Sequence, residues 1–361
     1  MTDKRVYNFS AGPSQLPMPV LEAARDQMLN YNGSGQSVME MSHRSAVYQQ
    51  IFDETKADLK ELLNIPDNYK ILLLHGGATQ QFGTVALNLL HKGRADYIVT
   101  GQFSGKAAQE ASKFGDVHIA YSGKEGGFKH IPSQDELDIR DDIDYVHLCN
   151  NNTIYGTEWN YVPDTKGAPL VVDMSSDILS RPVDVSKYGV IYAGAQKNMG
   201  IAGLGVIIIR EDLITPHKEN IQVLSEYDTM VKSDSMYNTP PAYAIYVLGL
   251  MLKWLKSMGG LEEMQKRSVA KAKLLYDYLD NQDFYIPHAE PAARSNMNVT
   301  FTTPNKDLDA KFVKESIEAG MVNLKGHRSV GGIRASIYNA MPIEGVEYLV
   351  DFMKKFAEEN K

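Results

Sequence analysis

Short apolar runs recur between residues 65 and 210, and they constrain the fold of this chain more than any other feature. Each is rich in Ile, Val, Leu and Tyr, so we interpret each as a buried strand. The seven runs are YKILLLH, DYIVTG, VHIAYS, YVHLC, PLVVDMS, VIYAG and GVIIIR. Helix-like segments lie between several of them, including residues 80–93 and 104–115, the second with Gly115 as its expected C-cap. This alternation predicts an α/β fold with a mostly parallel, seven-stranded sheet covered on both faces.

The pattern changes after residue 240, where two long helical segments follow each other with a break at Gly259 and Gly260. From about residue 291 to the end, strand-like and helix-like segments alternate again and indicate a smaller α/β unit. The stretch before residue 64 has helices of its own, which we expect to wrap back onto that smaller unit. We therefore predict an N-terminal arm at 1–15, a large domain at 16–255 and a small C-terminal domain at 256–361, packed with part of the N-terminal segment.

Composition narrows the class of protein. The 361 residues are 43% hydrophobic, enough for a large core, and the net charge of −8 comes without any block of basic residues. This argues against a general nucleic-acid or membrane-surface binder. No run has signal-peptide or membrane-span character, so we expect a cytoplasmic protein. The single cysteine, Cys149, is expected to be an inert buried thiol, and the nine histidines show no HExxH-like pairing, so no metal site is expected.

Polar residues that follow the predicted strands indicate where a ligand binds, because the crevice of a parallel sheet lies beyond the carboxyl ends of its strands. The turn GGAT follows the first run, Asp173 ends PLVVD, and Lys197 follows VIYAG. Alone, the glycine turn is a tight turn, Asp173 a cap and Lys197 a solvated lysine more often than not. Together they suit pyridoxal phosphate, which needs a lysine amine, a carboxylate for its ring nitrogen and a phosphate cradle.

Longer motifs make the chain resemble a known family over essentially its whole length. They are NFSAGP, MEMSHRS, HGGAT, DMSSDILSRPVDVSKYGVIYAGAQKNMGIAGL, NTPP and LKGHRSVGGIRASIYNAMP. These motifs resemble the phosphoserine aminotransferases, a family of fold-type I pyridoxal-phosphate enzymes of class V. AGAQKN and GHRSVGGIRASIYNA are specific to that family, whereas GGAT and NTPP carry little information outside this order.

The resemblance implies a role for each candidate residue. Lys197 would bind the cofactor covalently and move the substrate proton, and Asp173 would pair with the pyridine nitrogen. The other cofactor contacts implied are Ala78, Thr79 and Gln196 at the phosphate, Thr153 near the phenolic oxygen, Phe103 on the ring face, and Asn238 and Thr239 from a neighbouring subunit. The substrate contacts implied are His43, Arg44, His327, Arg328 and Arg334. Without the resemblance, His43-Arg44 would be interpreted as an exposed helix start, His327-Arg328 as a polar turn and Asn238-Thr239 as a helix N-cap.

The chain departs from the family pattern at two positions. Family members often have tryptophan where this chain has Phe103, which can stack on a ring but lacks the indole area and N–H. Some have arginine where this chain has Thr79, so one anion contact is missing. These changes bear on the affinity for the cofactor and for the substrate phosphate, respectively.

The implied reaction is a transamination in two halves, from L-glutamate to the cofactor and from the cofactor to 3-phosphohydroxypyruvate. Its product would be O-phospho-L-serine, in serine biosynthesis, and the phosphorylated hydroxythreonine intermediate of vitamin B6 synthesis is a further candidate substrate. The shared phosphate contacts imply a homodimer with composite sites. The alternatives are another small-substrate aminotransferase, a cysteine desulfurase on the same fold, and a non-catalytic protein that binds phosphorylated metabolites. A desulfurase is disfavoured because Cys149 lies in a predicted strand.

Overall fold

The main sheet of the computed structural model, which describes residues 5–216 and 221–361, has seven strands. Their bounds are β2 Tyr69–His75, β3 Arg94–Val99, β4 Asp116–Ser122, β5 Tyr145–Cys149, β8 Leu170–Asp173, β9 Val190–Gly194 and β10 Leu204–Arg210. The spatial order is β2-β10-β9-β8-β5-β3-β4; β10 is antiparallel to both β2 and β9, and the other neighbouring pairs are parallel. Each strand contains most of one predicted run. The prediction of a mostly parallel, seven-stranded sheet is confirmed.

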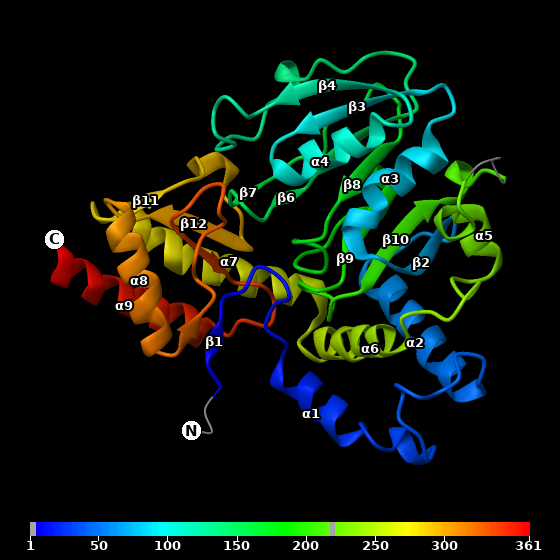
Figure 1. The fold of residues 1–361 in the computed structure, drawn as a ribbon, viewed down its shortest axis with the longest axis horizontal. Coiled ribbons are helices and arrows are strands. Elements are labelled where there is room, and N and C mark those ends of the chain that lie inside the picture. Colours follow the sequence, from blue (N-terminus) through cyan, green and yellow to red (C-terminus); the bar gives the residue numbers. More distant parts are fainter. Residues whose placement is uncertain (1–4, 217–220) are drawn as a thin grey trace.

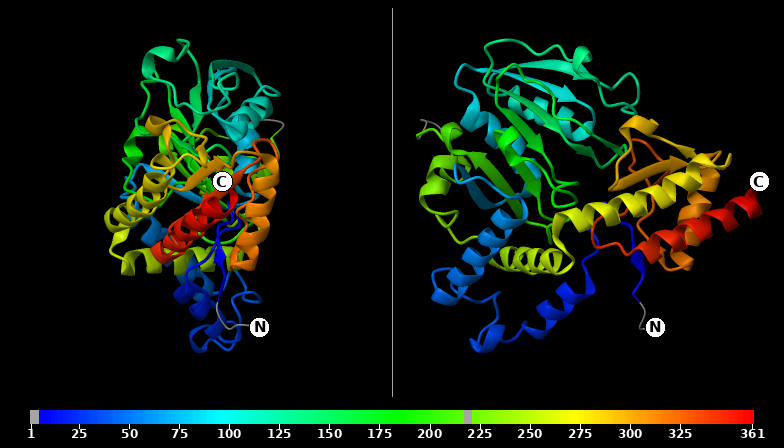
Figure 2. Two further views of the ribbon diagram at one scale, coloured as in Figure 1. Left: turned by 90° about the vertical axis from the view of Figure 1, so that its left-hand side faces the viewer. Right: turned by 180° about the vertical axis from the view of Figure 1, so that it is seen from behind.

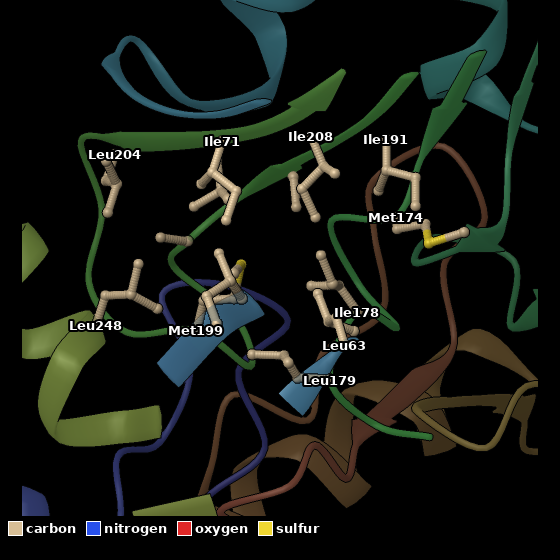
Figure 3. Packing of buried hydrophobic residues seen from close by; sticks show 14 of the residues in the cluster. Leu63, Ile71, Met174, Ile178, Leu179, Ile191, Met199, Leu204, Ile208 and Leu248 are labelled. Atoms are coloured by element: carbon tan, nitrogen blue, oxygen red, sulfur yellow. The ribbon is translucent and has the colours of Figure 1, made fainter. Parts of the chain in front are cut away.

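Helices cover both faces of this sheet (Figure 1). On one face lie α3 (Gly77–Leu89) and α4 (Gln102–Ala111), and on the other lie α2 (Ala46–Leu62) and α6 (Ala242–Ser257). Alternate residues of β10 belong to different cores: Ile208 packs on the α6 side and Ile207 on the α3 side. Figure 3 shows Ile208 and its neighbours Ile71 and Ile191 extending from the strands toward the α6 side. Burial on both faces explains why these strands are continuous apolar runs.

A smaller unit follows α6 and lies beside the large sheet (Figure 2). Its elements are α7 Gly260–Asp280, β11 Ile286–Pro287, β12 Asn298–Thr302, α8 Lys306–Glu318, β13 Met321–Val322, β14 Ile333–Ser336 and α9 Ile343–Asn360. β11, β12 and β14 form an antiparallel sheet around a core rich in phenylalanine. The predicted helix break is confirmed, since α6 ends before Gly259 and α7 begins at Gly260.

The N-terminal segment is divided between the two units, which corrects one expectation. β1 (Tyr7–Asn8) pairs with β13, and Phe9 joins the small core, so this part does wrap onto the small unit. α1 (Met18–Asp26) and α2 instead pack against α6, and their buried residues belong to the core of the large sheet. The burial of their apolar side chains therefore places α1 and α2 with the large sheet rather than with the small unit. The domain limit near residue 255 stays a prediction.

The expected C-cap of the helix over residues 104–115 is wrong. α4 ends at Ala111 and its C-cap is Ser112. Gly115 serves a close approach instead, because a Cβ added there would lie 2.7 Å from the carbonyl oxygen of Gly93. The Asp116 N–H donates to that same oxygen at 2.8 Å, which starts β4 beside β3. Among the described residues, no helix is long and apolar enough to cross a membrane.

Candidate active site

A cavity of about 460 Å³ opens where β8 and β9 end and α3 begins. Its lining includes many of the candidate residues, which come from segments as far apart as residues 78 and 334. These are Ala78, Thr79, Phe103, Thr153, Asp173, Gln196, Lys197, His327 and Arg334. The cavity thus lies at the carboxyl ends of the strands, the position expected for a ligand site in a parallel sheet.

Lys197 is buried in this cavity, with 8% of its surface exposed. Its Nζ donates a hydrogen bond to the Thr153 hydroxyl at 2.7 Å and lies 5.8 Å from the centre of the Phe103 ring. Burial lowers the pKa of Lys197, and the carboxylate of Asp173 partly opposes this. A lowered pKa makes the neutral, nucleophilic amine more abundant. Lys197 is therefore suited to covalent chemistry with a carbonyl compound.

Asp173 ends β8 and is buried beside Lys197. Its Oδ1 accepts two hydrogen bonds from Ser175, one from the hydroxyl at 2.5 Å and one from the backbone N–H at 2.9 Å. The Ser175 hydroxyl in turn accepts the N–H of Gly194 at 3.0 Å. Burial raises the pKa of Asp173, while Ser175 and Lys197 oppose the rise. No described residue donates a hydrogen bond to Oδ2, so this oxygen is available to a cationic ligand atom.

The start of α3 forms a cradle for an anion. Its N-cap is Gly76, which has a φ of 93° and no side chain to satisfy the first N–H groups of the helix. Ala78, Thr79 and Gln196 line the cavity at this point. The packing against β10 requires glycine, because a Cβ at Gly205 would lie 3.2 Å from the carbonyl oxygen of Gly77. Free N–H groups and the helix dipole favour a phosphate here.

Positive charge gathers at the side of the cavity that faces the small unit. Arg334, on β14, donates through Nη1 to the Thr153 carbonyl at 3.4 Å, and its buried Nε has no partner among the described residues. Burial lowers the pKa of Arg334. Burial also lowers the pKa of His327, and the charges of Arg334, Arg328 and Lys106 lower it further. A site with several cationic groups and an unpaired guanidinium N–H suits an anionic substrate.

Five predicted residues do not line this cavity in the described parts of one chain. Arg44 and Arg328 are exposed, and His43 is half-buried in the turn before α2. Asn238 lines a second cavity of about 210 Å³ on the other side of Gly76, and the carbonyl of Thr239 lies 2.9 Å from Nε2 of His75. A role for these residues therefore needs a second chain or a movement of their segments.

Two features of the site were not predicted. Ser175 binds Asp173, and the only signal for it is its position two residues after that aspartate. Residues 11–13 of the N-terminal arm also line the cavity, and the Ser14 hydroxyl donates to the Lys197 carbonyl at 2.7 Å. Nothing in the local sequence indicates that the arm reaches a loop so distant in the chain.

Comparison with known proteins agrees with this geometry. A model of the class-V aminotransferase family matches residues 6–349. The phosphoserine aminotransferase of Nitrosomonas europaea is 52% identical, over 98% of this chain and 98% of its own length. The structure of phosphoserine aminotransferase from Bacillus circulans subsp. alkalophilus has a TM-score of 0.97 at 45% identity and covers 99% of both chains. The pyridoxal-phosphate-bound enzyme of Trichomonas vaginalis has a TM-score of 0.93 at 39% identity, covering 97% of this chain and 100% of its own. The chain belongs to the phosphoserine aminotransferase family of the class-V aminotransferases.

Proposed function

We propose that this chain uses pyridoxal phosphate to transfer the amino group of L-glutamate to 3-phosphohydroxypyruvate, yielding 2-oxoglutarate and O-phospho-L-serine. One observation carries the proposal: a single cavity is surrounded by buried Lys197 and Asp173, the open start of α3 and an Arg334 N–H that has no partner among the described residues. The kinship with phosphoserine aminotransferases supports the choice of substrates.

The residues of the cavity fit this cofactor. Oδ2 of Asp173, which no described residue pairs, is available to the protonated ring nitrogen, α3 offers N–H groups for the phosphate, and Phe103 offers a ring face. Thr153 lies within hydrogen-bond reach of Lys197 and would hold the phenolic oxygen. When bound, pyridoxal phosphate supplies an electron sink that makes the Cα proton of an amino acid acidic.

The chemical work of the protein falls mainly to Lys197 and Asp173. Lys197 would hold the cofactor covalently and, once an incoming substrate amine displaces it, would carry the proton away from the substrate Cα. Burial keeps its pKa low, so that the freed amine can act as a base. The Asp173 carboxylate would keep the ring nitrogen protonated, and Ser175 orients that carboxylate through two hydrogen bonds.

Substrate recognition is assigned to the cationic side chains. Arg334 would bind the α-carboxylate, since a guanidinium matches a carboxylate with two parallel hydrogen bonds. The substrate phosphate, or the distal carboxylate of glutamate, would be bound by the basic pairs His43-Arg44 and His327-Arg328. One pocket would serve both substrates in turn.

The test compares amine donors in the half-reaction with the purified holoenzyme. Phosphoserine and glutamate should react well and alanine poorly, because alanine has no distal anion. Replacing Arg328 with Ala should weaken phosphoserine and glutamate by about 1.5–3 kcal/mol, the range for a charge-assisted hydrogen bond, and affect alanine little. Adding 4-phosphohydroxythreonine as a fourth donor tests the vitamin B6 reaction. A preference of the unmodified protein for alanine over phosphoserine contradicts the proposed substrate.

A cytoplasmic homodimer with shared sites is part of the proposal. Asn238 and Thr239 lie outside the cavity of their own chain, which suits a contact with the cofactor phosphate of a partner. Mixing Lys197→Ala with a variant changed at both Asn238 and Thr239 should restore some activity, because each heterodimer holds one intact site. Heterodimers that form and stay inactive would argue against shared sites.

The alternatives have less support. Cys149 lies in β5 as a buried free thiol, and burial raises its pKa well above the usual value, so it is poorly suited to desulfurase chemistry. A non-catalytic binding protein would not need an amine like that of Lys197. Another small-substrate aminotransferase is distinguished by the donor comparison described above.

A further inference from the structure

Lys271, on α7, is a buried lysine outside the cavity lining, with only 2% of its surface exposed. Its Nζ donates hydrogen bonds to three backbone carbonyls: Ile337 at 2.9 Å, Tyr338 at 2.6 Å and Met341 at 3.0 Å. All three protons of the ammonium are thereby used. Burying a lysine costs free energy unless its donors are satisfied. The three hydrogen bonds therefore stabilise both the buried lysine and the conformation of residues 337–341.

Two of these five residues, Tyr338 and Asn339, bind segments that line or adjoin the catalytic cavity. They follow β14, the strand that carries Arg334. The Asn339 N–H donates to Oδ1 of Asn198 at 3.0 Å, next to Lys197 in the chain. The Tyr338 hydroxyl donates to the Ala11 carbonyl at 2.8 Å, in the arm that lines the cavity. Residues 337–341 therefore join the strand of Arg334, the lysine loop and the N-terminal arm.

We infer that Lys271 is a positioning residue, which fixes residues 337–341 and through them holds the N-terminal arm and the lysine loop in place around the cavity. Lys271 touches no reacting group. Its ammonium provides three directed bonds to a segment without regular secondary structure, which an apolar side chain of similar length could not provide. The inference deepens the proposed function but rests on contacts that exist without it.

Hydrogen exchange of the protein without cofactor tests this inference independently of activity. Lys271→Met should speed exchange roughly tenfold or more in peptides covering residues 9–16 and 336–342, because the segment loses charge-assisted bonds. The reporters are the N–H groups of Ser14 and Asn339, which bond across the junction. Lys271→Gln, which keeps two N–H donors, should give an intermediate effect and serves if the Met variant folds poorly.

Leu349→Ala is the control for a general loss of stability, since Leu349 is fully buried on α9 and shares the small core with Phe9, Ile337 and Met341 but has no polar side-chain atom to bond residues 337–341. It should destabilise the small unit as a whole and speed exchange in residues 9–16 less than Lys271→Met does, because it leaves the hydrogen bonds of the junction in place. Tyr338→Phe should speed exchange in residues 9–16 alone. In the holoenzyme, Lys271→Met should raise KM for glutamate by a larger factor than Leu349→Ala. Equal exchange in residues 9–16 for Lys271→Met and Leu349→Ala overturns the inference, whichever substrate the enzyme uses.

Discussion

Lys197 and Lys271 are both buried, and burial lowers the pKa of both, that of Lys271 to about 7. Their surroundings differ. Lys197 donates one hydrogen bond, to Thr153, and faces a cavity, whereas Lys271 donates three to a packed loop. A lowered pKa alone would mark both as reactive. The comparison teaches that an unsatisfied donor facing open space distinguishes a chemical lysine from a structural one.

Replacing each lysine in turn is the strongest test of this difference between Lys197 and Lys271. Lys197→Ala should keep the fold and lose turnover by roughly four powers of ten, because both the covalent attachment and the proton transfer depend on this amine. Lys271→Met should retain covalently bound cofactor and measurable turnover. Steady-state rates and the visible absorbance of the two variants provide the measurement. Near-normal activity in Lys197→Ala would remove Lys197 from the mechanism.

A smaller loss is expected when the carboxylate beside Lys197 is neutralised. Asp173→Asn should slow proton abstraction about a thousandfold, or about 4 kcal/mol, because an amide does not keep the ring nitrogen protonated. The control is Asp177→Asn in the same loop, where burial already raises the pKa of the carboxyl to about 7. That variant should keep most of the rate. The rate of proton abstraction is measured in single-turnover experiments with glutamate, and an unchanged rate in Asp173→Asn contradicts the assigned role.

The smallest effect is expected when the hydrogen-bond acceptor of Lys197, the Thr153 hydroxyl, is removed. Thr153→Val deletes an acceptor that stabilises the charged ammonium, so the pKa of Lys197 should fall further, by less than about one unit. Cofactor uptake needs the neutral amine. Its pH profile should therefore shift to lower pH in Thr153→Val, as followed by absorbance after mixing with the apoprotein. A shift to higher pH would mean that the Thr153 hydroxyl does not stabilise the ammonium.

The sequence predicted the sheet well because strands buried on both faces are continuous apolar runs, and the ends of those strands located Lys197 and Asp173. Residues whose position depends on distant packing were harder to predict. Gly115 was interpreted as a helix cap, although its contact is with Gly93 in another loop. The helices before residue 64 were expected to wrap onto the small unit, although residues 16–255 were assigned to the large domain, because the apolar faces of α1 and α2 do not indicate which core they join.

The burial of Lys271 could have been predicted from its spacing in the sequence. Lys271 lies three residues after Ser268 and four before Leu275, so all three occupy the buried face of α7. A lysine on such a face indicates a buried amine with hydrogen-bond partners. Those partners lie in residues 337–341, which the sequence of the helix does not identify. Five predicted residues lie outside the cavity of their own chain, and a role for them needs a second chain or a movement of their segments, neither of which one sequence describes: His43, Arg44, Arg328, Asn238 and Thr239. Their roles stay predictions.

The contact between the arm and residues 337–341 has a consequence for biosynthesis. The Tyr338 hydroxyl and the Ala11 carbonyl are 327 residues apart in the chain, and Phe9 belongs to a core built mainly from the last ninety or so residues. During translation, Lys197 is synthesised well before residues 337–341, which bind the arm that lines its cavity. Closing so distant a pair is a slow step in folding. The site therefore stays incomplete until almost the whole chain has been translated, and a chain truncated before residue 338 lacks the contact between Tyr338 and Ala11.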